Sequence, residues 1–536
     1  MTTKPPSDLH LSALVVDSVS VARRFVAREE VVTPALSADA FVFPGGAEGD
    51  VLTQTASGLA AWLPNDGGGG NACEPGYDAV IVATPDPDCP EEYATVAEAA
   101  AVGAQNILVK EATTIAADPT FAVATTLFVM EGVDLTVSAD LTCTDRLTLD
   151  GPGTLALGAA VDVTAPEIHV KVCNWNLGAF QVDFIGTNVT VTAAQVESNN
   201  GTLQFSLTAA EQQVTVSDLQ TVPSSTMTIN ATCANLTLTN CALPGTGILL
   251  SSGAGGRIAN STFGTGDFTV ANASRPVDLS GLHFAGAVTF VSGIAASQFR
   301  AVGCTFDLTL TLTMDGGLYP ADFQLHDCVV TGNCTGSMTS SNANQRLSIQ
   351  GCDFGGSMTL TNIASYLRFC NNRLTSGGVL GGTLGSTNLV CTGNTSPSSL
   401  RLGDFGGTEF NLMWCNNLIA VAQNFFGDGV VGGTICNNAS ESLNMSDLTS
   451  CVFVGNKFTG GTGVAINQMT DCTYASNIAI GGTGHNFSAH PLNCQITGNR
   501  GNLVTVAGAQ SNILVGNKGT ITNFTGTEVP AGVNIP

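Results

Sequence analysis

The chain has 536 residues and a formal net charge of −25, with 44% hydrophobic and only 11% charged residues. Its 62 glycines and abundant Thr, Ser, Asn and Val predict strands and tight turns almost throughout, and its hydrophobic content argues against disorder. With only 17 lysines and arginines and no strong cluster of them, nucleic acid and anionic membranes are poor partners, and no segment is apolar enough to span a membrane.

Residues 1–75 are predicted to form a region of their own. The first residues lack the apolar core and cleavage site of a signal peptide, so entry into a secretory pathway is not supported. Val51–Thr55 and Leu59–Leu63 predict a hairpin with Ser57-Gly58 at its turn, and Gly67–Gly70 predict a flexible linker. We interpret this β-rich region as an attachment or oligomerisation element.

Residues 76–140 are predicted to hold an N-terminal cap and the first coils of a repeat. Thr95 and Glu98 have the spacing of a capping box at the start of a short helix, and Gly103 ends that helix. The strand Asn106–Lys110 follows at once. A helix here would cover the open end of a solenoid, whose exposed strand edges invite aggregation.

A short motif recurs through residues 141–536. We take the residue two positions after each cysteine as its marker, and in later copies without that cysteine we take the corresponding asparagine. The intervals run from 18 to 24 residues and average about 21, which indicates stacked repeats. The markers are Trp175, Val196, Leu219, Leu243, Phe263, Phe284, Phe306, Val330, Phe354, Asn372, Asn394, Asn417, Asn438, Asn456, Asn477, Asn499 and Asn517.

We predict an all-β fold, a right-handed parallel β-helix solenoid, on the order of 80 Å long if its coils stack at the strand spacing. Cysteine and marker are two residues apart, so both should point inward and form ladders of cysteines, phenylalanines and, toward the C-terminus, asparagines. Leucine-rich repeats fit the same period, but their return segments are helical or leucine-rich. Here the return segments are rich in Gly, Thr and Ser, as in SGGVLGGTLGST.

The cysteines follow the repeat rather than a disulfide pattern. They number 17, an odd count, and include no CxxC pair, so we interpret them mainly as buried, reduced small hydrophobes. Cys304, Cys328 and Cys352 are 24 residues apart, and Cys415 and Cys436 are 21 apart. In-register parallel strands point their Cβ atoms the same way, which disfavours disulfide geometry. We therefore predict free thiols at all five positions.

Two segments resemble proteins of virus particles. Tyr93–Gly103, followed by Ile107–Val109, resembles the opening of pectin-lyase-like β-helices in viral and phage proteins, although Ala112–Thr114 stands where Gly-Thr-Tyr usually follows. Gly49–Thr53, with Gly58 and Trp62, resembles a hairpin of tail-fibre and particle proteins of phages and large (giant) DNA viruses. The two matches cover about 30 and about 20 residues. The resemblance implies a virus-particle surface or fibre protein.

Parallel β-helices also host polysaccharide lyases and glycoside hydrolases, which place carboxylates close together. The best candidates are Asp404, Glu409 and Asp428 on two successive coils, with Arg401 close by. We favour solvated turn residues at these positions, and the enzymatic alternative stays open. Asp327 and Asp353 flank cysteines and are expected to face solvent.

No cofactor or metal site is predicted, because the six histidines have no ligand spacing. Only His485 and His490 lie near each other in the sequence. Twelve N-x-[ST] sequons leave glycosylation undecided, since they carry glycans only if the chain enters a secretory lumen.

The leading functional hypothesis is a structural protein of a virus particle: a fibre, spike or surface-layer component assembled in the host cytoplasm. We expect a homotrimer or larger multimer that contacts other particle proteins through residues 1–75. The first alternative is a tailspike-like enzyme acting on host surface polysaccharide, although only three Trp and five Tyr are available for sugar stacking. A cellular adhesin is disfavoured by the missing secretion signal. Contact with host carbohydrate is compatible with either of the first two hypotheses.

Overall fold

The structure is a computed structural model that describes residues 51–54, 60–63 and 76–523. Within the last range it omits residues 173, 193–194, 207–212, 223, 233–234, 251–254, 274–275, 293–296, 315–320, 339–345, 364–365, 383–387, 403–410, 422, 426–429, 461–462, 482, 490 and 506–511. The chain divides into two units, Met1–Gly69 and Gly70–Pro536.

The described part of the first unit is a pair of short strands. β1 (Val51–Gln54) pairs antiparallel with β2 (Ala60–Leu63), with Val51 opposite Leu63. The two strands of the predicted hairpin are therefore present, each slightly shorter than expected. Its turn and the Gly67–Gly70 segment lie outside the described residues.

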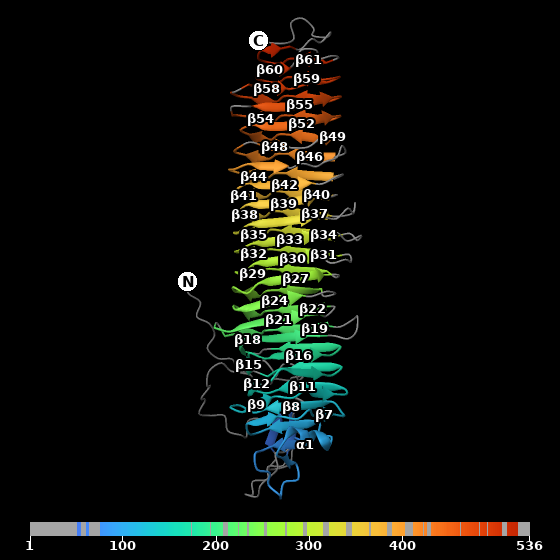
Figure 1. Ribbon diagram of the computed structural model, residues 1–536, viewed down its shortest axis with the longest axis vertical. Helices are drawn as coiled ribbons and strands as arrows, with labels where there is room; N and C mark the ends of the chain where they lie inside the picture. Colours follow the sequence, from blue (N-terminus) through green and yellow to red (C-terminus); the bar gives the residue numbers. More distant parts are fainter. Residues whose placement is uncertain are drawn as a thin grey trace, which may run out of the picture. The chain divides into compact units, whose positions relative to one another are not determined.

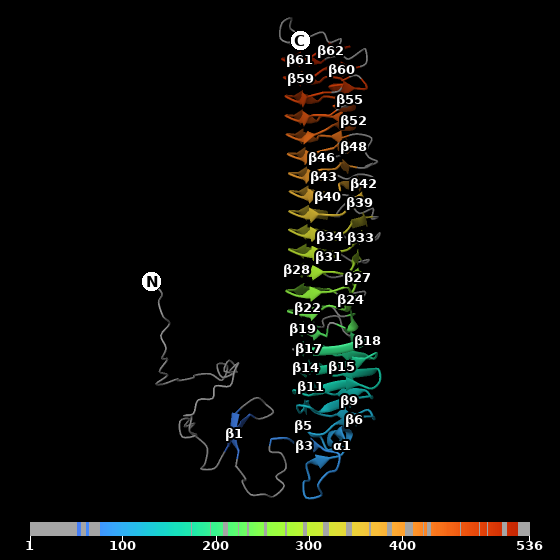
Figure 2. The ribbon, with the colours of Figure 1, turned by 90° about the vertical axis from the view of Figure 1, so that its left-hand side faces the viewer.

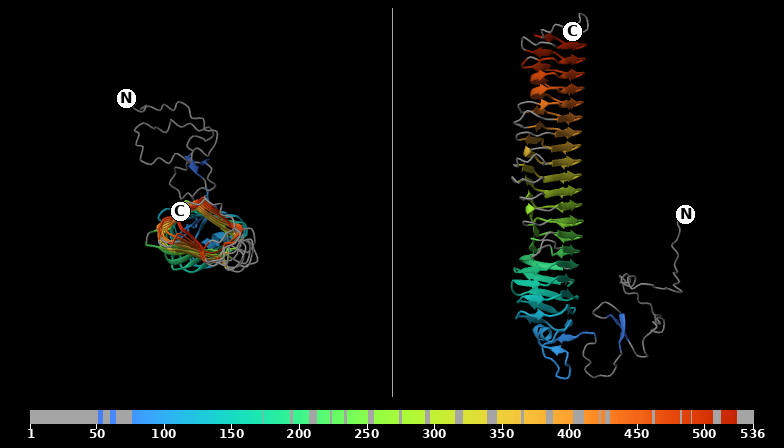
Figure 3. Two further views of the ribbon diagram at one scale, coloured as in Figure 1. Left: turned by 90° about the horizontal axis from the view of Figure 1, so that it is seen from above. Right: turned by 90° about the vertical axis from the view of Figure 1, so that its right-hand side faces the viewer.

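The second unit is a parallel β-helix of about 16 turns (Figure 1). A typical turn contributes β31 (Ser297–Val302), β32 (Thr305–Phe306) and β33 (Leu310–Met314) to three different parallel sheets. The next turn begins with β34 (Ala321–His326), which pairs in register with β31. Figures 2 and 3 show the strands of successive turns lying above one another. The prediction of an all-β parallel β-helix is confirmed.

We call the three sheets first, second and third, in the order in which the chain visits them in each turn. The first sheet runs from β3 (Ala79–Ile81), which pairs with β5 (Asn106–Val109), to β61 (Ile513–Val515). The second runs from β6 (Thr113–Ile115) to β57 (Ile478–Ala479), and the third from β7 (Thr120–Phe121) to β62 (Ile521–Thr522). Because the return segments are strands, the arrangement differs from that of leucine-rich repeats.

The predicted helix is α1 (Val96–Ala101), at the N-terminal end of the solenoid (Figure 1). The Thr95 hydroxyl accepts from the Glu98 N–H at 3.2 Å, and the Glu98 carboxylate accepts from the Thr95 N–H at 3.2 Å, which completes the capping box. Val96, Ala99 and Ala100 are buried in the same core as the first coils. Gly103 follows the helix with a φ of 79°, a conformation that glycine adopts without strain.

Inward-facing side chains form continuous columns along the solenoid. In the second sheet, β26 (Thr262–Phe263), β29 (His283–Phe284) and β32 place three phenylalanines in register. The rings of Phe263, Phe284 and Phe306 stack with centroids 5.1 and 5.4 Å apart and interplanar angles of 7° and 2°. The predicted run of phenylalanines is thus an interior stack, in the offset geometry that aromatic pairs favour.

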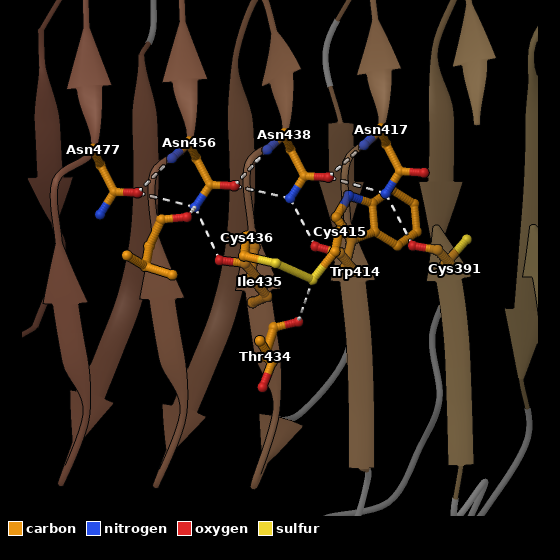
Figure 4. The surroundings of a disulfide bond; sticks show 11 residues. Cys391, Trp414, Cys415, Asn417, Thr434, Ile435, Cys436, Asn438, Asn456 and Asn477 are labelled. Carbon is orange, nitrogen blue, oxygen red and sulfur yellow. Dashed lines mark hydrogen bonds between the residues drawn. A yellow bond between two sulfur atoms is a disulfide. The ribbon is translucent and has the colours of Figure 1, made fainter. Parts of the chain in front are cut away.

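An asparagine ladder fills the turn between the first and second sheets in the C-terminal half. Each Asn side-chain oxygen accepts from both the backbone N–H and the side-chain NH₂ of the Asn one coil earlier (Figure 4). Each NH₂ group also donates to a strand carbonyl, as Asn438 does to Trp414 at 2.7 Å. Every described amide of the ladder is buried yet bonded, which removes the cost of burying it. The ladder comprises Asn372, Asn394, Asn417, Asn438, Asn456, Asn477, Asn499 and Asn517.

The predicted register is wrong in one respect, because the motif combines two different cysteine positions. Cys352 follows the left-handed residue Gly351 and lies below Asn372, whose Oδ1 accepts from the Cys352 N–H at 2.9 Å. The cysteine ladder and the asparagine ladder are therefore one column. In the copies FCNNR, WCNNL and ICNNA the cysteine instead precedes the left-handed residue, so Cys370 pairs with Gln350 on the outer side of the first sheet.

The prediction of free thiols is correct for Cys304, Cys328 and Cys352 but wrong for Cys415 and Cys436, which form a disulfide (Figure 4). Cys415 ends β46 (Asn411–Cys415) and Cys436 ends β50 (Thr434–Cys436), with Cα atoms 4.6 Å apart. Both adjoin left-handed asparagines, where the backbone leaves the strand direction. Their side chains are therefore less strictly parallel than those of mid-strand pairs, which relieves the geometric objection to a disulfide.

Replacing Asn438 by Ala should destabilise the C-terminal coils. Two donors of Asn417 would lose their acceptor and the Trp414 carbonyl would lose its donor, at about 1–3 kcal/mol for each buried group left unsatisfied. Native-state hydrogen exchange measures this local opening. Asn411→Ala is the matched control, because Asn411 is exposed and should change stability by less than about 0.5 kcal/mol. Equal effects of the two substitutions would argue against the ladder.

Peptide mapping of unreduced, alkylated protein should recover Cys415 linked to Cys436. Burial raises the pKa of the Cys241 thiol to about 11 and that of Cys334 to about 12, so both should resist iodoacetamide near neutral pH until the chain unfolds. In Cys436→Ser protein no new link should appear, since Cys370 and Cys415 are two coils, about 10 Å, apart. Links among Cys304, Cys328 and Cys352 would contradict the structure.

Candidate functional site

The three candidate catalytic carboxylates cannot be built into a site. Asp404, Glu409 and Asp428 all lie outside the described residues. Their expected neighbour Arg401 is exposed on β45 (Leu400–Leu402) of the third sheet. The enzymatic hypothesis therefore gains no geometric support at these positions.

The other polar candidates lie on the outer side of the solenoid, as the sequence predicts for Asp327 and Asp353. Asp327 is an exposed left-handed turn residue, and Asp353 is half-buried beside Arg373 of the next coil, with an ion pair of 3.1 Å. His283 Nε2 lies 2.7 Å from Oδ2 of Asp307, which belongs to the next coil. His10 and His490 lie outside the described residues. In the described part of the chain, no three His, Cys, Asp or Glu side chains are grouped to hold a metal.

A hollow of about 370 Å³ lies on the outer face of the first sheet. It spans four coils, on β19 (Gln213–Ser217), β22 (Asn235–Thr239), β25 (Gly256–Ala259) and β28 (Val277–Ser280). Gly256, the first residue of β25, lies in the lining together with Asn235 and Pro276 of the neighbouring coils. The polar lining consists of Gln213, Thr215, Asn235, Thr237, Arg257 and Asp278.

The lining of this hollow suits a ligand rich in hydroxyl groups. Two amides, two threonine hydroxyls, a guanidinium and a carboxylate supply both donors and acceptors within one surface. Arg257 and Asp278 are in-register neighbours on adjacent strands, and both are exposed. The hollow has no aromatic lining residue and no acid–base pair, so its chemistry is that of binding by hydrogen bonds.

A column of carboxylates runs along the outer side of the third sheet near the N-terminal end. The Asp140 N–H donates to Asp118 Oδ1 at 3.0 Å, and the Asp162 N–H donates to Asp140 Oδ1 at 2.8 Å. Asp162 pairs in register with the buried Asp183. Desolvation, followed by the charges of Asp140 and Asp183, raises the pKa of Asp162. These stacked acids were missed in the sequence because their spacing of 22, 22 and 21 residues becomes meaningful only once the coil lengths are known.

His485 is the one histidine that is fully enclosed among the described residues. It lies on the inward side of β58 (His485–Phe487), with Nδ1 2.6 Å from the Tyr474 hydroxyl and Nε2 3.0 Å from the Arg500 carbonyl. The carbonyl can only accept, so Nε2 carries the proton and Nδ1 accepts from Tyr474. Burial lowers the pKa of His485 to about 4. This histidine is a neutral structural group of the core.

Comparisons with known proteins do not assign the site. No family model, no curated protein and no solved structure matches the chain. In the described residues, no helix is both long and apolar enough to cross a membrane. The functional argument therefore depends on the fold and on the surface of this chain.

The C-terminal coils should loosen in acid because of His485. The unfolded chain binds a proton with a pKa near 6.5, whereas the folded chain binds it only near 4, so the stabilising contribution is complete above about pH 6.5. It is lost as the pH falls from about 6.5 to 4, by about 3 kcal/mol in total. Hydrogen exchange near Tyr474 at pH 7 and pH 4.5 measures this change.

The control is His485→Phe, which removes the titrating group. It should be less stable at neutral pH, since the Tyr474 hydroxyl and the Arg500 carbonyl lose their partner. Its local stability should also depend less on pH between 6.5 and 4. An unchanged pH dependence in this variant would rule out His485 as the source.

Proposed function

We propose that the chain is a structural rod of a virus particle: a fibre, spike or surface-layer component that is attached to the particle by residues 1–75. The observation that carries the proposal is the uninterrupted stack of about 16 turns, in which each coil pairs with its neighbours along three sheets. Such a solenoid sets a length and presents a long outer surface without needing a larger core. The resemblance of Tyr93–Gly103 to β-helices of viral and phage proteins supports the same assignment.

The cysteines are compatible with assembly in the host cytoplasm. Eleven described cysteines, from Cys143 to Cys494, are buried thiols outside any disulfide, as expected for folding in a reducing compartment. Among the described residues one disulfide is present, Cys415–Cys436, which joins the ends of two neighbouring strands of the first sheet. We propose that it forms after folding, when the chain meets oxidising surroundings.

A tailspike-like polysaccharide-cleaving enzyme is the second candidate. The polar hollow on the first sheet favours it, because its hydrogen-bonding groups suit a polysaccharide. The stacked carboxylates of Asp162 and Asp183 lie on a different sheet from the hollow. Release of oligosaccharides from neutral or acidic polysaccharides, abolished by Asp162→Asn, would support the enzyme over the structural rod.

The chain should be present in purified particles and should form a homotrimer or larger multimer. Proteomics of purified particles tests the location, and light scattering of the full chain tests the assembly. A chain shortened to begin at Cys73 should lose the assembly, because residues 1–75 are proposed to provide the oligomerisation element. Absence from particles would overturn the proposed location. Monomers of both chains at high concentration would overturn the role of residues 1–75.

A further inference from the structure

Four arginines gather on the outer face of the first sheet in the central coils. Arg257, Arg300 and Arg368 lie in one column, in which Asp278, Gln324 and Ser348 occupy the intervening coils. Arg346 lies in the neighbouring outward column, between Asp322 and Tyr366. We call these four residues the arginine stripe, and all four are exposed.

The guanidinium groups of the stripe are not engaged by carboxylates. The ion pairs of the described residues are His169–Glu167, His283–Asp307 and Arg373–Asp353, and none of them includes a stripe residue. Asp322, the acid in register with Arg346, accepts instead from Gln324 Nε2 at 2.9 Å. In a chain with a net charge of −25, unpaired arginines on one face are an exception that calls for an anionic partner.

A second observation points to the same face. His326 lies on β34 beside the stripe, and its Nε2 is buried without a hydrogen-bond partner. Desolvation, then the charge of Arg300 and also that of Arg368, lowers the pKa of His326, while Asp327 and Asp322 act against them. On balance, the nearby charged side chains therefore make the electrostatic potential at the His326 ring positive. An acceptor delivered by a ligand would bond the arginines and could also accept from Nε2–H of a neutral His326.

The stripe continues directly into the polar hollow. Arg257 belongs to both features, and Asp278 of the hollow lies in register between Arg257 and Arg300. Asn235 and Gln213 extend the polar surface toward the N-terminal coils. A long ligand lying parallel to the rod axis would thus meet a hydroxyl-binding surface at one end and cations at the other. That arrangement fits an extended polymer better than a compact molecule.

The spacing of the cations identifies the chemistry of the polymer. At about 4.8 Å per coil, Arg257 and Arg300 are about 10 Å apart, and Arg300 and Arg368 about 14 Å apart. A nucleic-acid strand carries one charge per about 3.4 Å, which is far denser than the stripe. Amide and hydroxyl side chains such as Gln324 and Ser348 fill the intervals. Sparse cations among such groups suit a hydroxyl-rich chain with widely spaced anions.

We propose that the arginine stripe and the hollow bind an acidic polysaccharide along the rod, with its carboxylates or sulfates on the arginines. The planar guanidinium fork bonds both kinds of anion in a bidentate way. The inference deepens the proposed function, because it gives a surface-exposed rod its ligand class. Carboxylated and sulfated polysaccharides can both bind to arginines in this way, and comparing one of each distinguishes them.

The test uses the full chain in a binding assay at about 0.15 M salt, where screening over about 8 Å limits repulsion by distant acidic groups. The probes are hyaluronate, which carries one carboxylate per disaccharide, chondroitin sulfate, neutral dextran and a single-stranded DNA oligonucleotide. We expect binding to hyaluronate or chondroitin sulfate, and much weaker binding to dextran and DNA. Stronger binding of chondroitin sulfate would indicate that sulfates are preferred to carboxylates alone. The double variant Arg300→Gln/Arg368→Gln should weaken that binding at least about tenfold.

Arg373→Gln is the matched control, since it removes an exposed arginine that pairs with Asp353 in the second sheet. It should leave the affinity within about twofold, and thermal melting should show both variants folded. Failure to bind either acidic probe, an equal loss in the control, or DNA binding as tight as that of the polysaccharides would each overturn the inference. Particle proteomics is independent of this result, so the stripe and the proposed location can fail separately.

Discussion

The in-register stacking of coils is the constraint on which the rest of the structure depends. Each residue in a coil has a counterpart about 4.8 Å above and below it, so an inward position must suit its own column as well as its own turn. Phenylalanines therefore stack on phenylalanines, as Phe263, Phe284 and Phe306 do. The buried asparagine amides fit this interior because each neighbouring coil completes their hydrogen bonds.

The outer side of the sheets obeys no such restriction, and its character changes along the rod. On the middle outward column of the first sheet, Thr215 and Thr237 give way to Arg257 and Arg300, and later to the exposed Met413. Interior columns thus maintain one architecture while successive stretches of the surface carry different chemistry. A solenoid separates folding from recognition in this way because alternate residues of each strand serve only one of the two purposes.

Much of the architecture could be predicted from the sequence because the period, the capping box and the asparagine run are local patterns. The register of the cysteines could not, since the motif places Cys352 after a left-handed residue and Cys415 before one, a difference of backbone conformation that the letters alone conceal. The hollow is lined by residues of four successive coils, and the arginine stripe depends on the pairing of coils of unequal length. To predict either feature from the sequence, one would need to know the exact number of residues in each turn. The three predicted carboxylates lie outside the described residues and stay untested.

The asparagine ladder also has a direction. Each side-chain oxygen accepts from the coil before it, and from Asn372 to Asn499 each side-chain NH₂ donates to the Asn of the coil after it, so the amide dipoles point the same way along the ladder. A coil that has just closed presents donors that only the next coil can satisfy, whereas its own acceptor is already in use. Chain synthesis delivers coils in this same order. The ladder is therefore a template that reads from the N-terminal side to the C-terminal side, so that each finished turn specifies where the next one must close.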